Sequence, residues 1–168
     1  QFDAKIYKAE EVNTHGGSIR VFIKKGKNIK VEGSVKKILI DEEKYGIKKF
    51  KTYQDFGKKV YDIRKNVIKK INDIKKRGDK IIGYGSPAKA TTALNFFGIS
   101  DELEFVIEDN KLKQGKFIPG VKIPIQDKSK IQDNNNTMLV LAWNFFKEIK
   151  SKNSHLSKKI INIKDLEK

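Results

Sequence analysis

The chain has 168 residues, no cysteine, two histidines and a formal net charge of +16. This length suits one domain with a core of its own, and the residue counts exclude disulfides, thiolate metal sites and histidine-rich metal sites. No run approaches the ~18 apolar residues of a membrane span, and the first ten residues lack the basic start and apolar stretch of a signal peptide. We therefore expect no membrane partner, no bound metal, and a reducing, cytoplasmic setting.

The positive charge has two interpretations. A polyanionic partner, either nucleic acid or a phosphorylated substrate, would account for it. However, only Arg20, Arg64 and Arg77 are arginines among the 37 basic residues, whereas proteins that read bases rely on the bidentate arginine fork. Isoleucine and asparagine are also abundant, as in proteins from AT-rich genomes. We therefore interpret the lysines as codon bias on a solvated surface, and expect no specific nucleic-acid partner.

The first third of the chain predicts a strand pair followed by a short helix. Residues 6–12 and 18–23 have the composition of strands, and the sharp turn between them contains two glycines. Residues 24–33 form a polar loop. Ser34 is placed to cap a helix that runs to about residue 44 and ends at Gly46.

Residues 53–77 predict a long amphipathic helix. Its apolar residues recur at steps of three and four, which forms one stripe along the helix. The stripe consists of Phe56, Val60, Ile63, Val67, Ile71 and Ile74. A coiled coil is the alternative, but the stripe lasts little more than three heptads and a strand follows. We therefore expect Val60, Ile63, Val67 and Ile71 to be buried against a sheet.

The remaining sequence alternates between strands and helices. The expected strands cover residues 80–84, 103–107, 120–125, 138–142 and 159–163, and the expected helices cover residues 88–97 and 144–152. Such alternation predicts a parallel sheet covered on both faces. The fold class is therefore α/β, with a Rossmann-like, mainly parallel sheet that follows an N-terminal strand pair and a long helix.

A glycine-containing turn joins the strand at 80–84 to the next helix. Gly85 would let the backbone approach a ligand, and the helix start offers N–H groups to an anion. Ser86 is the expected N-cap, with Pro87 at the first helical position. Lys89 could reach back to a phosphate. The alternative is an ordinary capped turn, and the strand–turn–helix context favours the ligand site.

The same turn matches the dinucleotide pattern G-x-G-x-x-A over residues 83–88. In that pattern an acidic residue about 20 positions further on binds the ribose. Glu108 and Asp109 lie at the end of the next predicted strand. An NAD-type nucleotide site is therefore one hypothesis for this chain.

The loop at residues 109–116 also begins at a strand end, where loops of open parallel sheets line the ligand crevice. Lys113, Gln114 and Lys116 would suit a diphosphate, and a plain solvated loop is the alternative. Asn144 follows another strand on the same rim, beside Trp143. That pair could hold a sugar or base ring, but a core tryptophan with an asparagine cap is the preferred interpretation. His15 could carry a proton, although a turn histidine is more often structural.

Five sequence blocks together resemble a known family. They are H-G-G-S-I-R-V at 15–21, G-Y-G-S-P-A-K at 83–89, K-Q-G-K at 113–116, P-G-V-K-I-P-I at 119–125 and A-W-N-F at 142–145. In this order they resemble the C-terminal domain of S-adenosylmethionine-dependent sugar C-methyltransferases, over roughly residues 10 to 150. In that family a zinc module and a class I methyltransferase domain come first, and a Rossmann-like domain follows that helps to bind a nucleotide-linked deoxysugar.

The resemblance implies an accessory role. Residues 1–24 would be the junction with, or the last strands of, a preceding methyltransferase domain, and residues 25–168 the C-terminal domain. A nucleotide-linked sugar or similar phosphorylated small molecule would lie near Gly85, Ser86, Lys89 and the loop of Asp109, Lys113, Gln114 and Lys116, with Asn144 on the same rim. His15 and Arg20 would lie at the interdomain face.

The family's zinc module, cofactor loop and catalytic segment are not found in this sequence. We therefore expect no catalytic residue and no cofactor site in this chain, with S-adenosylmethionine bound by an upstream domain of the same parent protein. A stand-alone NAD-type domain remains the alternative, and a basic nucleic-acid-binding module is a weaker one because only the charge supports it.

Overall fold

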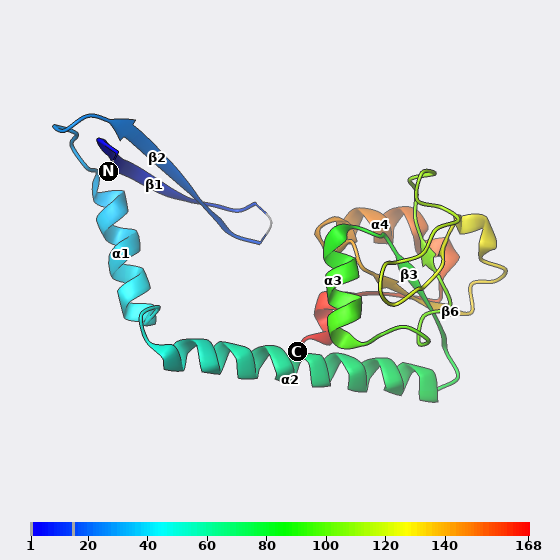
Figure 1. The fold of residues 1–168 in the computed structure, drawn as a ribbon. Coiled ribbons are helices and arrows are strands. Elements are labelled where there is room, and N and C mark those ends of the chain that lie inside the picture. Colours follow the sequence, from blue (N-terminus) through cyan, green and yellow to red (C-terminus); the bar gives the residue numbers. More distant parts are fainter. Residues whose placement is uncertain (1, 15) are drawn as a thin grey trace. The chain divides into compact units, whose positions relative to one another are not determined.

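The computed structural model describes residues 2–14 and 16–168. The chain divides into two compact units, Gln1–Lys58 and Lys59–Lys168. Figure 1 shows the elements of both units in chain order. The division falls inside a long helix, and each unit is described by itself below.

The first unit is built on an antiparallel hairpin. Strand β1 (Ala4–Val12) pairs with β2 (Ser18–Lys25), as the sequence predicts, and the register slips between Ile6 and Lys8. The hairpin has little apolar burial, because one of its faces leaves four β-branched residues about half exposed. These are Ile6, Ile19, Val21 and Ile23. A two-stranded hairpin is marginally stable in water unless another element packs against it.

Helix α1 (Gly33–Tyr45) lies next to β1. Every residue of this helix is described, and none of them is buried. Its N-cap is Glu32, so the prediction that Ser34 caps the helix is wrong. The Ser34 hydroxyl instead accepts a hydrogen bond of 3.3 Å from the N–H of Ala9. The helix ends at Gly46, whose φ of 82° is the left-handed conformation that glycine adopts readily.

Helix α2 (Phe50–Lys76) carries the predicted apolar stripe. Within the second unit, Val67 and Ile71 are buried in the core, and Ile63 is partly buried and packs against it. Val60 is only half-buried, and Phe56 in the first unit is 62% exposed. The stripe is therefore covered only along the part of the helix that packs on the core of the second unit, so the predicted burial of Val60 is too deep.

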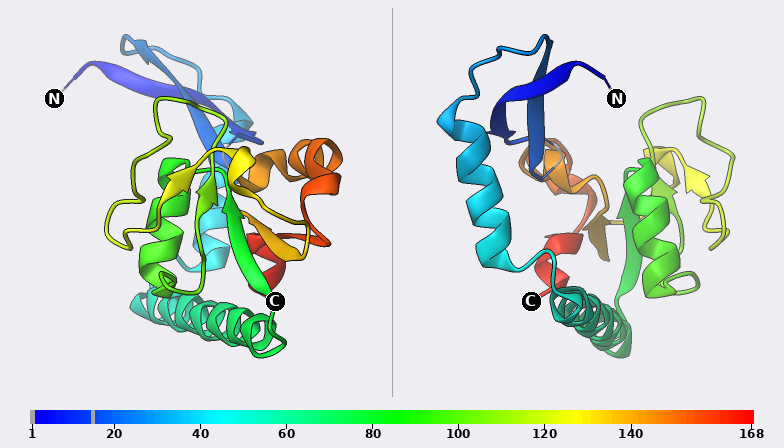
Figure 2. Two further views of the ribbon diagram at one scale, coloured as in Figure 1. Left: turned by 90° about the vertical axis from the view of Figure 1, so that its right-hand side faces the viewer. Right: turned by 60° about the vertical axis from the view of Figure 1, so that its left-hand side comes forward.

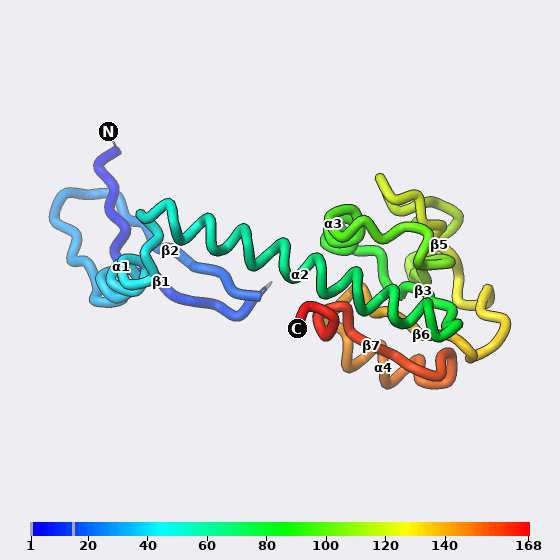
Figure 3. Tube along the Cα trace, turned by 90° about the horizontal axis from the view of Figure 1, so that it is seen from below, coloured from blue at the N-terminus to red at the C-terminus, as the bar shows by residue number. Residues whose placement is uncertain are grey.

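The second unit contains a five-stranded parallel sheet, as the sequence predicts. Its strands are β3 (Lys80–Tyr84), β4 (Val106–Ile107), β5 (Ile125–Gln126), β6 (Asn136–Val140) and β7 (Lys159–Asn162). The strand order is β5-β4-β3-β6-β7. From the central strand β3 the chain adds β4 and β5 on one side, and then crosses over to add β6 and β7 on the other side. Figure 3 shows β3, β6 and β7 seen from below.

Helices cover both faces of this sheet. Successive strand residues point to opposite faces, so Ile81 and Leu139 pack with α2 and with α3 (Ala88–Phe97), whereas Ile82 and Met138 pack with α4 (Phe146–Asn153). Figure 2 shows α3 and α4 on different sides of the strands. Each such buried side chain contributes about 1.5–3 kcal/mol. The expected Rossmann-like architecture is thereby confirmed.

Two expected strands are shorter than the sequence pattern indicates. The strand expected at 103–107 is reduced to β4. The strand expected at 120–125 begins only at Ile125, because Gly120 and Lys122 have φ angles of 84° and 57°, which an extended strand cannot contain. These residues form a tight turn, closed by a hydrogen bond of 2.8 Å from the Ile118 N–H to the Ile123 carbonyl.

Short 3-10 segments complete the unit. They are η1 (Lys128–Lys130), η2 (Trp143–Phe145), η3 (Ser154–Leu156) and η4 (Ile163–Leu166). The helix expected at residues 144–152 therefore begins as the 3-10 segment η2 and becomes α-helical only at Phe146.

Candidate functional site

A pocket of about 430 Å³ lies at the carboxyl ends of β3, β4 and β6. Its walls come from the turn after β3, the loop after β4, the segment after β6, and α4. The loops after β3 and β6 diverge there, because the chain continues to one side of the sheet from β3 and to the other from β6. Open parallel sheets bind their ligands at such a switch point. The position is the one that the sequence predicts for a ligand.

Gly85 lines this pocket. Its φ is 87°, and a Cβ atom built on it would lie 2.7 Å from the Cβ of Ala142. Only glycine combines that backbone conformation with so close a neighbour. Gly83, the first glycine of the pattern, is required for another reason, since a Cβ there would lie 2.8 Å from Val106 Cγ2 in the core. Close packing against protein neighbours therefore requires both glycines of the pattern.

Ser86 is held by the acidic residue at the end of β4. Its N–H donates a hydrogen bond of 2.9 Å to Oε2 of Glu108, and its hydroxyl donates to the same oxygen. The N-cap of α3 is Pro87, so the prediction that Ser86 caps the helix and Pro87 is its first residue is wrong. The carboxylate of Glu108 thereby satisfies the backbone N–H of Ser86.

Glu108 remains ionised in this environment. Burial by itself raises the pKa of a carboxyl group, and the side chain of Glu108 is only 14% exposed. Hydrogen bonds from Ser86 and from the Asn110 N–H, together with the charge of Lys113, outweigh burial and hold the pKa of Glu108 below its usual value of 4.5.

Lys113 reaches the turn, as the sequence predicts. Its Nζ donates a hydrogen bond of 2.9 Å to the Ser86 carbonyl and lies 3.6 Å from Oε2 of Glu108. Gln114 fixes the loop instead of facing the pocket, because its Nε2 donates to the Glu108 carbonyl at 2.7 Å. Lys116 is exposed and does not line the pocket.

Asp109 lies in the pocket wall, where it accepts a hydrogen bond of 2.7 Å from the hydroxyl of Tyr84. Burial, and then the hydrogen bond to Asp109, raise the pKa of Tyr84 to about 12. Tyr84 is therefore a neutral donor across the physiological range. Sequence analysis missed it as a pocket residue, although it lies between the two glycines of the turn.

Helix α4 and the segment before it supply residues that sequence analysis also missed. Phe145 lines the pocket and is 63% exposed. Glu148 and Lys152 lie one helical turn apart on the same wall and form an ion pair of 2.7 Å. The i,i+4 spacing of these two charges is the sequence feature that could have indicated the pair. Exposed helices commonly carry such pairs, so the spacing does not point to a pocket.

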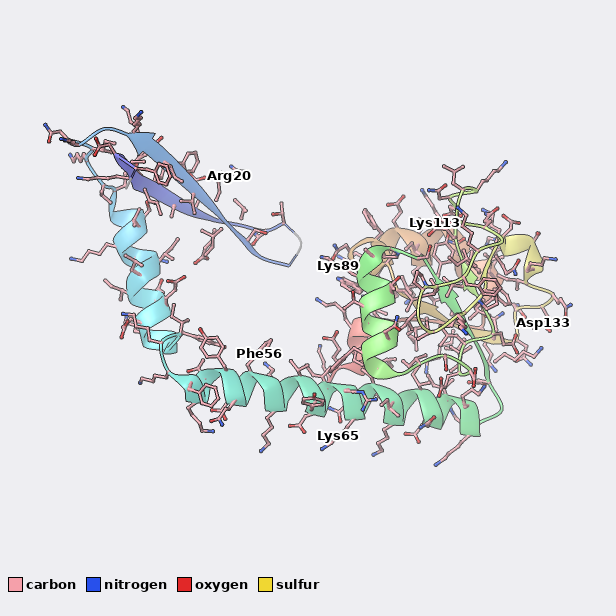
Figure 4. All side chains as sticks on the ribbon, in the orientation of Figure 1. Arg20, Phe56, Lys65, Lys89, Lys113 and Asp133 are labelled. Carbon is pink, nitrogen blue, oxygen red and sulfur yellow. The ribbon has the colours of Figure 1, made fainter. Side chains whose placement is uncertain are left out.

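Lys89 and Asn144 are not brought into this pocket. The Nζ of Lys89 lies 5.8 Å from the ring centroid of Trp143, within reach of a cation–π interaction. Asn144 lines a separate hollow of about 370 Å³ together with Trp143 and Asn162. Figure 4 labels Lys89 on α3 and Lys113 on the loop after β4. Of the two lysines, only Lys113 lines the pocket.

The remaining predicted residues belong to the first unit. Arg20 is an exposed residue of β2 and lies 3.8 Å from the carboxylate of Glu10. His15 lies outside the residues that the structure describes. The role of both residues at an interdomain face stays a prediction.

Within residues 2–14 and 16–168, no cluster of three histidine, cysteine or carboxylate side chains is placed to hold a metal ion. In the same residues, no helix is long and apolar enough to cross a membrane.

Comparisons with known proteins identify the family of this chain. The family model of the C-methyltransferase C-terminal domain matches residues 13–162. A curated relative, C-methyltransferase NovU from Streptomyces niveus, is 30% identical over 148 residues, which are 86% of this chain and 35% of that protein. The chain thus spans about a third of the relative's length. With this match across most of its residues, the chain belongs to the C-methyltransferase C-terminal domain family.

Proposed function

We propose that this domain holds a nucleotide-linked sugar, or a similar phosphorylated small molecule, for S-adenosylmethionine-dependent C-methylation by an upstream domain of the same parent protein. The observation that carries the proposal is the pocket at the switch point of the sheet, which combines an exposed aromatic ring with carboxylates and lysines. Such a mixture suits a ligand that has a ring, hydroxyl groups and a diphosphate.

Each part of the ligand has a matching group in the pocket. The exposed ring of Phe145 offers a flat apolar surface to a base or sugar ring. The carboxylate of Asp109 can accept hydrogen bonds from sugar hydroxyls. Lys152 brings positive charge from the wall formed by α4, and ammonium groups bind phosphate oxygens. The domain would thus fix the acceptor while chemistry proceeds elsewhere.

The pocket does not suit a dinucleotide such as NAD. In that binding mode the pyrophosphate lies against the N–H groups of the glycine turn, whereas the Ser86 N–H of this turn donates to Oε2 of Glu108. S-adenosylmethionine is assigned to the upstream domain, as the family resemblance implies, and we derive no step of methyl transfer from this chain. The same contacts argue against a stand-alone NAD-type domain.

Calorimetric titration with a nucleoside diphosphate sugar tests the proposal. We expect the parent chain to bind it, and Lys152→Met to weaken binding about threefold or more, because an exposed ammonium–phosphate contact is screened by solvent. Lys150→Met is the matched control, since it removes the same charge from the same helix outside the pocket. Lys89→Ala should also bind within about twofold of the parent. Absence of binding by the parent, or equal losses in the Lys152 and Lys150 variants, would disprove the proposal.

A further inference from the structure

We propose that Glu108 is an internal anion that occupies the phosphate position of the glycine turn, and that it thereby determines which part of a ligand can approach this turn. The inference rests on the proposed function only in taking the pocket as the ligand site. It adds a specificity-determining residue, and it predicts that the turn rejects phosphate and accepts hydrogen-bond donors.

The contacts of Ser86 carry the inference. Both hydrogen-bond donors of this residue, its N–H and its hydroxyl, converge on Oε2 of Glu108. A phosphate bound at the start of a helix accepts hydrogen bonds from backbone N–H groups of this kind. The carboxylate therefore makes, within the protein, the contacts that a phosphate would make with Ser86.

Lys113 contacts the same two residues, Ser86 and Glu108. Its Nζ lies 3.6 Å from Oε2 of Glu108 and donates to the Ser86 carbonyl. The ammonium group that would pair with a bound phosphate at the turn is thus already paired with the internal carboxylate. The turn presents a local ion pair to the pocket instead of a net positive charge.

The position of Glu108 is fixed by its own backbone. Its N–H donates a hydrogen bond of 3.1 Å to the Gln126 carbonyl, which continues the pairing of β4 with β5. Its carbonyl accepts a hydrogen bond of 2.7 Å from the Gln114 side chain, and its second carboxylate oxygen accepts one of 3.1 Å from the Asn110 N–H. Moving the side chain away would leave the Ser86 N–H without this acceptor in a residue that is almost fully buried.

The arrangement discriminates between ligand groups by charge. A phosphate oxygen that approaches the Ser86 N–H would meet a carboxylate oxygen already at hydrogen-bond distance, and like charges side by side are strongly unfavourable. A sugar hydroxyl meets no such repulsion, because it can donate to a carboxylate. In the pocket, the sugar would lie toward Glu108 and Asp109, and the diphosphate toward Lys152.

Inorganic pyrophosphate tests the inference without any sugar or base. The affinity is measured by calorimetry, and the Ser86 amide is followed by NMR during the titration. In the parent chain we expect no pyrophosphate-dependent shift of the Ser86 amide. Glu108→Gln retains an oxygen that can accept from Ser86 but loses the charge, so we expect about tenfold tighter binding and a clear shift of that amide.

Asp109→Asn is the matched control. It removes one charge from the neighbouring residue and keeps an acceptor for the Tyr84 hydroxyl. We expect it to tighten pyrophosphate binding by less than about threefold and to leave the Ser86 amide unshifted, because charge removal alone acts weakly across solvent. Equal gains in both variants, or no gain in Glu108→Gln, overturn the inference.

The Ser86 amide of the parent chain provides a second test, which does not require that any variant folds. A saturable shift of its Ser86 amide by pyrophosphate shows that phosphate reaches the turn despite Glu108, and overturns the inference directly. Pyrophosphate carries no sugar, so either outcome is distinct from the binding or failure of a nucleotide-linked sugar.

Discussion

At the scale of single residues, Gly85 combines two constraints that can be separated by mutation. Its φ is 87°, and a Cβ would collide with Ala142, whereas Gly78 has a φ of 80° and no atom within 4 Å of its added Cβ. Gly78→Ala should therefore cost about 1 kcal/mol from backbone strain alone. Gly85→Ala should cost about 2–4 kcal/mol, because overpacking adds to the strain. Urea unfolding of both variants measures the difference, and equal costs would show that the close contact relaxes.

Glu108 should also make stability depend on pH. Its pKa in the folded state is lower than the usual value of 4.5, so the ionised carboxylate stabilises the fold above the unfolded-state pKa. This contribution is lost as pH falls from about 4.5 through the lower, folded-state pKa. Glu108→Gln lacks the titrating group, so its unfolding free energy should fall less steeply below pH 4.5 than that of the parent. Parallel curves for the two proteins over this range would contradict the assignment.

At the scale of elements, the apolar stripe of helix α2 is buried in the C-terminal part of the helix and exposed near its start. Ile71 is buried in the core, whereas Phe56 on the same stripe is 62% exposed. Ile71→Ala should destabilise the protein by about 2–5 kcal/mol, because it removes apolar contacts and leaves a cavity. Phe56→Ala should change the stability by no more than about 0.5 kcal/mol. Thermal or urea unfolding distinguishes the two, and a large loss in the Phe56 variant would show that this side chain is covered in solution.

At the scale of the whole molecule, the charge should act without sequence preference. The net charge of +16 comes mostly from lysine, and lysines distributed over a surface release counterions without reading bases. We expect weak DNA binding with a steep dependence on salt, and affinities within about tenfold for unrelated sequences. Fluorescence anisotropy at two salt concentrations measures both properties. A preference of several kcal/mol that survives at physiological salt would establish a specific nucleic-acid function.

The sequence by itself determined the architecture, because periodicity is a local property. The three-and-four spacing along α2 and the alternation of strands with helices depend only on neighbouring residues. The place of the turn at 83–89 at the rim of the pocket followed as well, since the carboxyl ends of parallel strands lie at the same edge of their sheet. Lys113 was found for the same reason, because its loop begins at the end of β4.

The tertiary structure alone decided which side chains meet. Ser86 and Glu108 are 22 positions apart, and the register of β3 beside β4 places the carboxylate over the turn. Sequence analysis predicted Ser86 as a helix cap and a ligand contact, and Glu108 only as a ribose contact in the NAD-type alternative, because it weighed each residue against its near neighbours. Lys89 lies near Trp143 for a similar reason, since these residues follow β3 and β6, whose carboxyl ends are paired side by side. Contacts across strands depend on the register of the sheet, which no short sequence window contains.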